Sequence, residues 1–262
     1  MGKTITICNQ KGGTGKTTTA INLSVALALA DKSILLIDLD PQANTTSGLG
    51  INKHNIKTST YHALLEEAEI KDILQSTSIN KLMVAPSNLD LTGAEVELVG
   101  ALGREHRLKR ALSKIRDDFD FVIIDSPPSL GLLTINGLCA ADSVLIPVQC
   151  EYYALEGLTQ LLNTIRLVKD NLNAGLEVEG VLLTMADFRT NLTKEVIQEV
   201  RQNFAKVYQT VIPRNIRLTE APSFGQPIAV YDKDSIGSQK YSELAQEILG
   251  QPLKAAITPG GH

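Results

Sequence analysis

Short apolar runs, rich in β-branched residues, recur along this chain between longer helical segments. Five of them fall at residues 4–8, 33–38, 121–125, 143–147 and 178–183. Their hydrophobicity is continuous rather than alternating, which is typical of strands that are covered on both faces in a parallel sheet. Because strands and helices alternate, we expect an α/β fold with a doubly wound, mostly parallel sheet whose ligands bind at the carboxyl ends of the strands.

The helical segments and the chain length predict a single domain. Residues 18–30 are apolar on nearly all sides, so we expect a helix packed inside the molecule. A chain of 262 residues is long enough to bury one large core. We therefore expect one domain over residues 1–250 and a flexible tail over residues 251–262, which contain two prolines and two adjacent glycines. Amphipathic helices are expected at residues 104–116, 155–169 and 192–204.

Charge and cysteine content limit the classes of function. The net charge is -4 and the pI is near 5.6, whereas a DNA-coating protein is usually basic overall, so any DNA contact must come from a local patch. Cys8, Cys139 and Cys150 are odd in number and lack C-x-x-C spacing, which argues against a disulfide framework and a zinc site. The sequence shows no signal peptide and no apolar run of the ~20 residues that a membrane span needs, so we expect a cytoplasmic protein.

A glycine-rich stretch follows the first predicted strand and leads directly into the buried helix. It reads Lys11-Gly12-Gly13-Thr14-Gly15-Lys16-Thr17-Thr18. Glycines let the backbone wrap so that consecutive N–H groups point at phosphate oxygens, and the amino terminus of the helix adds partial positive charge. The usual pattern has glycine where this chain has Gln10. We still predict a P-loop NTPase fold, in which Lys16 reaches the β- and γ-phosphates of ATP and the Thr17 hydroxyl binds Mg²⁺.

Longer blocks of sequence resemble one group of ATPases. KGGTGKTT, followed by IDLDPQAN and VIIDSPPS, is similar to the ParA/MinD group, whose phosphate loop is called a deviant Walker A motif. The blocks at residues 184–192, 212–228 and 231–241 favour the short chromosomal ParA type, also called Soj. The resemblance implies that Lys11 reaches across a dimer interface to the phosphates of the partner's ATP, and that Gly12 lies where the two chains approach most closely. Two facing nucleotides concentrate negative charge, which lysines from both subunits neutralise.

Three aspartates at the ends of predicted strands are the candidate hydrolytic and metal-binding residues. Asp38 and Asp40 end the second strand, where alternate residues share a face. By resemblance, Asp40 positions the attacking water and Asp38 acts through the water shell of magnesium. Asp125 ends the third apolar strand, at the Walker B position, and is expected to hold a magnesium-bound water. A helix-capping or loop-solvating carboxylate is the alternative role for each of them.

The base of the nucleotide is expected further along the chain. Related folds imply a place near Met185 and the turn that contains Pro213 and Asn215. Met185 is equally compatible with an ordinary core position, since methionine fills irregular gaps in apolar cores.

A local excess of positive charge lies in one part of this acidic chain. Residues 200–219 contain no Asp or Glu and four cations: Arg201, Lys206, Arg214 and Arg217. Such a patch binds phosphates without reading sequence, although a solvated basic face is the alternative on charge alone. The resemblance to partition ATPases implies non-specific DNA binding here. The candidate contacts are Arg189 and Arg217, with Arg214, Lys194 and Lys240 beside them.

The leading hypothesis is a partition ATPase. By resemblance, ATP drives formation of a homodimer, the dimer binds DNA of the nucleoid, and a ParB-type centromere-binding protein stimulates slow hydrolysis. Partition of a chromosome or a plasmid is implied, and another large cargo stays open.

Three other classes fit less well. A MinD-like ATPase at a membrane surface needs a basic amphipathic helix at the carboxyl terminus, and residues 253–258 offer one lysine, so no membrane partner is expected. A protein similar to the nitrogenase iron protein needs two suitably placed cysteines. A scaffold without hydrolysis leaves Asp40 without a role.

Overall fold

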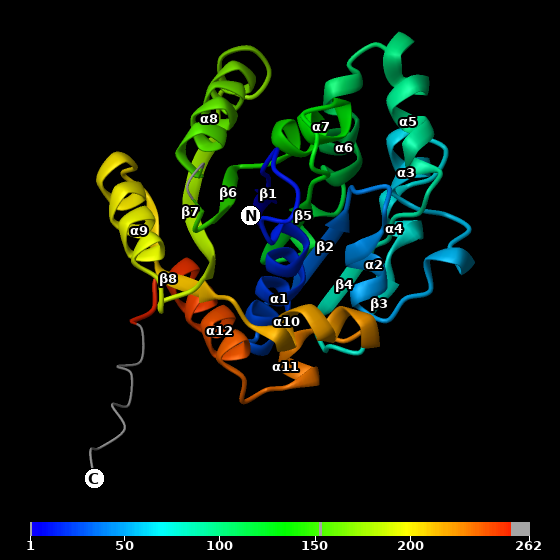
Figure 1. Ribbon diagram of the computed structural model, residues 1–262. Coiled ribbons are helices and arrows are strands. Elements are labelled where there is room, and N and C mark those ends of the chain that lie inside the picture. The colour runs from blue at the N-terminus through cyan, green and yellow to red at the C-terminus, as the bar shows by residue number, and fades with distance from the viewer. Residues whose placement is uncertain (1, 152–153, 253–262) are drawn as a thin grey trace.

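An eight-stranded sheet forms the middle of the computed structural model, which describes residues 2–151 and 154–252 (Figure 1). The strand order is β3-β4-β2-β5-β1-β6-β7-β8. Neighbouring strands pair in parallel, except that β3 runs antiparallel to β4. The predicted single α/β domain with a mostly parallel sheet is therefore confirmed. The strands are β1 (Lys3–Ile7), β2 (Ile34–Asp38), β3 (Gln75–Ser76), β4 (Leu82–Ala85), β5 (Phe121–Asp125), β6 (Ser143–Gln149), β7 (Glu177–Ala186) and β8 (Val207–Pro213).

Helices cover both faces of this sheet (Figure 1). α1 and α12 pack together on one face, while α3 to α9 cover the other. The α-helices are α1 (Lys16–Leu29), α2 (Asn44–Gly48), α3 (Thr60–Leu64), α4 (Ile70–Ile73), α5 (Leu91–Glu97), α6 (Arg107–Leu112), α7 (Leu132–Ala140), α8 (Ala154–Asn171), α9 (Asn191–Asn203), α10 (Ile216–Glu220), α11 (Ile228–Tyr231) and α12 (Ile236–Ile248). Short 3₁₀ turns lie at Lys53–Asn55, Leu98–Gly100, Arg104–His106, Arg116–Asp118 and Ala221–Phe224.

Strand β2 shows why these runs are continuously apolar. Ile34 and Leu36 join the core cluster that contains α1, whereas Leu35 and Ile37 join the cluster beneath α3 to α6. All four side chains are fully buried. Since successive side chains of a strand point to opposite faces, a strand with helices on both sides needs an apolar residue at every position.

Helix α1 lies inside the molecule, as its composition predicts. Ten of its residues are buried, among them Ile21, Leu23 and Leu27. It starts directly after the glycine-rich stretch and packs beneath the sheet near β1, so it fixes the position of that stretch relative to the strand ends.

Some elements differ from the expected ones. β3, β4 and β8 were not among the predicted strands: β3 and β4 are short, and β8, at the sheet edge, has polar residues among its apolar ones, of which Gln209 is exposed. The helix expected at residues 104–116 is shorter: a 3₁₀ turn at Arg104–His106 precedes α6, which ends at Leu112, and a second 3₁₀ turn follows at Arg116–Asp118.

The remaining expectations on the chain as a whole concern the cysteines, the membrane and the tail. Cys8, Cys139 and Cys150 are free and buried, as small side chains of an apolar core often are. None of the helices within the described ranges is long and apolar enough to cross a membrane. The predicted tail falls mostly on residues 253–262, which lie outside the described residues.

Candidate nucleotide-binding site

The glycine-rich stretch forms a loop between the end of β1 and the start of α1. Gly13 and Gly15 have φ values of 76° and 87°, a left-handed conformation that side chains rarely adopt. The first N–H groups of α1 have no intrahelical partner, because they lie at the start of the helix. Gly15, the N-cap residue, has no side chain that could accept a hydrogen bond from them. This arrangement leaves them for an anion, as the sequence predicts for a phosphate.

Two side chains that sequence reasoning missed hold the loop in place. The Asn9 side chain accepts a hydrogen bond from the Lys11 N–H at 3.0 Å and donates to the Pro147 carbonyl on β6 at 2.7 Å. The Thr184 hydroxyl on β7 donates to the Thr14 carbonyl at 2.9 Å. The loop is thereby fixed to two strands that follow it by more than a hundred residues, a relation that no local pattern reveals.

The two lysines of the loop have different environments. Lys16 is only 7% exposed, and its Nζ donates to the Lys11 carbonyl at 3.2 Å. Burial lowers the pKa of Lys16, while the nearby Asp125 opposes that shift. Lys11 lies on the surface, and its Nζ is 2.7 Å from a carboxylate oxygen of Glu151. The Lys16 side chain therefore lies against the loop of its own chain, whereas the Lys11 side chain pairs with Glu151.

Strand pairing brings the predicted carboxylates together at the phosphate loop. Asp38 and Asp125 are register partners on β2 and β5, and Asp125 is also paired with Ile7, the last residue of β1. Asp40 follows two residues after Asp38 and is 8% exposed. Its N–H donates to Asp38 Oδ1 at 3.1 Å, and its own Oδ1 accepts from the Gln42 N–H at 2.9 Å.

Burial dominates the electrostatics of these carboxylates. Asp38 and Asp125 are both fully buried. Burial, together with the neighbouring Asp125, raises the pKa of Asp38 to about 7. Burial raises the pKa of Asp125 to about 6, although the hydroxyls of Thr45 and Thr17 oppose this shift. Two buried acids side by side favour a cation between themselves and the phosphate loop.

The donor set fits magnesium bound together with a nucleotide. Among the described residues, no group of three His, Cys, Asp or Glu side chains could hold a metal ion alone. Asp125 Oδ1 is buried and lacks a hydrogen-bond partner in the described parts of the chain, so one carboxylate oxygen is left for a donor. Mg²⁺ commonly combines one or two protein oxygens with phosphates and water, and Thr17, Asp38 and Asp125 could hold it in that way.

A cavity of about 490 Å³ opens beside the loop, at the ends of β7 and β8. It is lined by the three predicted adenine residues, Met185, Pro213 and Asn215, and it adjoins the phosphate loop through Gly15 and Thr18. Met185 is half-buried and has a φ of 52°, so it belongs to the rim of this cavity rather than to the core.

The candidate DNA contacts lie in the loops after β7 and β8 and on the helices α9, α10 and α12, and several of them are partly neutralised. The Arg214 N–H donates to the Ala186 carbonyl, so the loops after β7 and β8 adjoin. The Arg189 side chain is 87% exposed, and its Nη2 is 2.6 Å from Asp187. Arg217 pairs with Glu220 at 3.0 Å and with Asp232 at 3.5 Å, and Lys240 pairs with Glu243 at 2.6 Å. Arg214 and Lys194 are exposed. The sequence window of high positive charge ends one residue before Glu220, which explains why it missed these acids.

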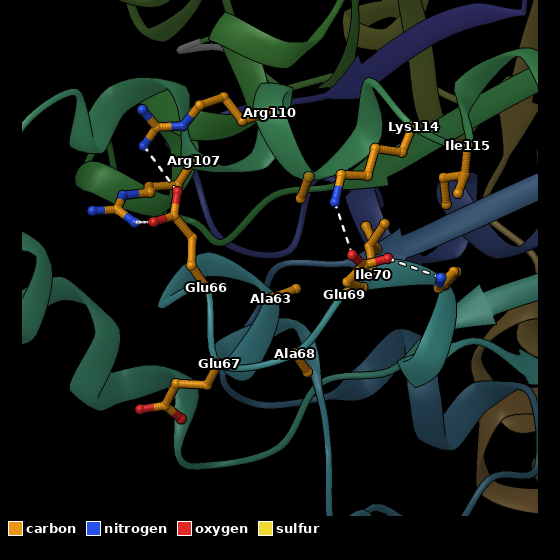
Figure 2. Close-up of a pocket in the computed structure, with 12 residues that line it drawn as sticks. Ala63, Glu66, Glu67, Ala68, Glu69, Ile70, Arg107, Arg110, Lys114 and Ile115 are labelled. Atoms are coloured by element: carbon orange, nitrogen blue, oxygen red, sulfur yellow. Dashed lines mark hydrogen bonds and ion pairs between the residues drawn. The ribbon is translucent and has the colours of Figure 1, made fainter.

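A second cleft, of about 390 Å³, lies between α6 and the segment that joins α3 to α4 (Figure 2). None of the predicted site residues lines it. Arg107 and Arg110 line it from α6, Lys114 from the turn that follows α6, and Lys71 from α4. Glu66 pairs with both arginines, and Glu69 pairs with both lysines, at 2.8 Å to Lys114 and 3.0 Å to Lys71. The four cations of this cleft are therefore matched within the chain.

Comparisons with known proteins agree with the arrangement of the loop and the strands. A family model described as an AAA domain matches residues 2–178. The sporulation initiation inhibitor protein Soj of Bacillus subtilis is 58% identical over 249 residues, which cover 95% of this chain and 98% of that protein. The chromosome partitioning protein ParA of Myxococcus xanthus is 55% identical over 250 residues, which cover 95% of this chain and 88% of that protein.

A solved structure shows the same fold with ligands bound. Cobyrinic acid a,c-diamide synthase from Mycobacterium smegmatis, with a bound ATP analogue and magnesium, superposes with a TM-score of 0.84 at 38% identity. The match covers 95% of each chain. The ATP and Mg²⁺ predicted from the sequence correspond to the ligands of that structure.

Proposed function

The chain belongs to the ParA/Soj family of partition ATPases, and from this premise we propose that it is a switch whose two copies close around ATP and Mg²⁺. The closed dimer binds DNA without sequence preference, and a ParB-type centromere-binding protein stimulates hydrolysis and releases the dimer. The outcome is partition of a chromosome or plasmid.

The observation that carries this proposal is the contrast between Lys11 and Lys16. The Lys16 side chain lies against the loop of its own chain. The Lys11 side chain is half-exposed and forms an ion pair with Glu151. A Cβ atom added to Gly12 would meet no atom of the described residues within 4 Å, so packing within the described part of the chain does not require glycine there. A second copy that approaches at this point gives both features a role: Lys11 leaves Glu151 for the partner's phosphates, and Gly12 allows close contact.

Hydrolysis follows from positioning and charge neutralisation, which is what phosphoryl transfer mainly requires. Magnesium, when bound, neutralises phosphate charge. Lys16 lies where it can bind the β- and γ-phosphates. Asp40 is nearly buried and is fixed by the Gln42 N–H through Oδ1, so its carboxylate can orient an attacking water. Slow hydrolysis in the absence of a partner suits a switch, because the ATP state must last long enough to bind DNA.

DNA binding is proposed for the loops after β7 and β8 and for α10, which carry Arg189, Arg214 and Arg217. Their cations are exposed, and ion pairs such as that of Arg189 with Asp187 are surface pairs that phosphates can replace. One such surface binds weakly, whereas a dimer presents two at once and gains affinity through effective concentration. This couples DNA binding, and hence a place at the nucleoid, to ATP.

Sedimentation with ATP and Mg²⁺, followed by retention on non-specific DNA at two salt concentrations, tests this function. Asp40→Ala should bind ATP, lose hydrolysis by about 100-fold or more and accumulate as a DNA-bound dimer. Lys11→Ala should bind ATP as a monomer and fail to retain DNA.

The same experiment can overturn the proposal. An Asp40→Ala variant that stays monomeric with ATP and Mg²⁺ would contradict it, and so would a Lys11→Ala variant that dimerises as the unchanged chain does. Retention that does not weaken at higher salt would contradict binding through phosphates.

A further inference from the structure

Two consecutive threonines of α2 hold the two buried carboxylates of the candidate metal site. The Thr45 hydroxyl donates to Asp125 Oδ2 at 2.7 Å. Thr46 donates to Asp38 Oδ2 through both its hydroxyl, at 2.7 Å, and its N–H, at 2.8 Å. Both threonines are fully buried. This short helix lies only four residues after Asp40, so the segment with the candidate hydrolytic residue is attached to both acids.

The two threonines are anchored differently. The Thr46 hydroxyl also accepts a hydrogen bond from the Ser87 N–H at 2.9 Å, and Asp38 receives a further bond from the Asp40 N–H. Both carboxylate oxygens of Asp38 thus accept hydrogen bonds, and the Thr46 hydroxyl both donates and accepts one. Within the described parts of the chain, the Thr45 hydroxyl bonds to Asp125 alone, and Asp125 Oδ1 keeps no partner. The Thr45 bond thus fixes one oxygen of a carboxylate whose other oxygen is free.

A carboxylate that is held by one oxygen is also held in orientation. Without the Thr45 hydroxyl, Asp125 Oδ2 would lose its 2.7 Å hydrogen bond and the carboxylate would be less fixed about its side-chain bonds, with the Thr17 hydroxyl as the neighbouring donor that stays. Groups that orient metal-binding residues typically change metal affinity by about 10- to 100-fold when they are removed. The α2 helix itself starts from Ala43 in a left-handed conformation, with a φ of 54°, so its position depends on such bonds rather than on local preference.

We propose that Thr45 is a positioning residue for magnesium, which orients Asp125 so that Oδ1 faces the ion's water shell and which links the ion to the segment of Asp40. The inference rests on the proposed function, since it concerns the same nucleotide site. When magnesium is bound, α2 would thus be held more firmly, and so would the segment with Asp40 that precedes it.

The test measures binding of fluorescently labelled ADP as magnesium is added, and binding of the same nucleotide in EDTA. Thr45→Val should raise the half-saturating magnesium concentration by about tenfold, while affinity in EDTA stays within about twofold of the unchanged chain. Thr45→Ser keeps the donor and should restore the original magnesium dependence. Thr60→Val is the matched control, because Thr60 is equally buried and donates to the Asp38 backbone carbonyl rather than to a carboxylate.

A second readout follows the segment itself. Hydrogen exchange of residues 40–48 should slow when magnesium is added to the ADP complex of the unchanged chain, and this slowing should be lost in Thr45→Val. If Thr45→Val shows an unchanged magnesium dependence, or loses affinity equally with and without magnesium, the inference is wrong. If the unchanged chain binds no nucleotide, the proposed function itself is wrong, so the two failures are distinguishable.

Discussion

The phosphate-binding end of the sheet and the cleft between α4 and α6 both gather charged side chains, but they satisfy these charges in different ways. In the cleft, Glu69 is exposed and its pKa is lowered to about 2, because Lys114 and Lys71 both donate to it. At the phosphate loop, Asp38 and Asp125 are fully buried and have raised pKa values. The cations of the cleft are paired with acids of the same chain. The two buried acids at the phosphate loop are not paired in this way, and a bound metal ion and phosphates would balance their charge.

This difference separates a structural surface from a binding site. Exposed ion pairs contribute little to stability, typically ~0–1 kcal/mol each, and they need nothing else to be satisfied. Buried acids next to a lysine and a row of free N–H groups are costly without a ligand and become favourable when phosphates and a metal arrive. We therefore interpret the cleft as a structural contact between the regions of α4 and α6, and the phosphate loop as the proposed binding site for ATP.

The largest expected effect comes from removing the buried cation of the loop. Lys16→Ala should weaken ATP binding by about 100-fold or more, because it removes a buried cation whose Nζ lies against the loop. Titration with labelled nucleotide measures this. Lys114→Ala in the cleft is the control and should bind nucleotide normally. Affinity within tenfold of the unchanged chain for Lys16→Ala would remove the basis for treating the loop as the binding region.

Arg189, in the loop after β7, and Arg217, on α10, test whether charges that are already paired can still bind a ligand. Both arginines resemble the cations of the cleft in being paired with acids, yet we propose that they contact DNA. Arg189→Glu combined with Arg217→Glu should reduce DNA retention by about 100-fold at low salt and leave ATP-dependent dimerisation intact. A cleft variant with the same charge change, Arg110→Glu with Lys114→Glu, should retain DNA. Equal losses in both pairs would indicate a general charge effect instead of a local surface.

A smaller effect concerns the pH dependence of the free energy of unfolding, which should have opposite signs for an acid of the phosphate loop and an acid of the cleft. The raised pKa of Asp38 means that its contribution to stability is complete below its ordinary pKa of 3.8 and is lost as pH rises to about 7. The lowered pKa of Glu69 has the opposite consequence, since its contribution is complete above the ordinary value of 4.5 and is lost as pH falls toward 2.

Denaturant unfolding without nucleotide, in EDTA, measures both slopes. Asp38→Asn should reduce the loss of stability between pH 4 and 7 by about half, since Asp125 keeps its own raised pKa. Glu69→Gln should leave that interval unchanged and flatten the acid branch below pH 4.5. An Asp38→Asn variant with the original slope between pH 4 and 7 would show that burial of this acid is not what sets the pH dependence.

The candidate site could be predicted where its residues lie close in sequence or at the ends of strands. The loop residues from Lys11 to Thr17 are contiguous, and Asp38 and Asp125 follow apolar runs whose parallel pairing brings their ends to one edge. Met185, Pro213 and Asn215 were predicted only through resemblance, and the structure brings them into one cavity with Gly15. Residues that act through long-range hydrogen bonds gave no such signal, as Asn9, Thr45 and Thr184 show.

The sequence by itself determined the order of strand, phosphate loop and buried helix, because glycine conformation and apolar runs are local properties of the chain. Only the tertiary structure decided which distant groups meet: Thr184 with the Thr14 carbonyl, Thr45 with Asp125, and Glu151 with Lys11. It also decided that Arg217 pairs with Glu220 and Asp232. The physical reason is that hydrogen bonds and ion pairs depend on distances within a few ångströms, and strand register and loop packing set these distances between residues that composition and spacing cannot pair.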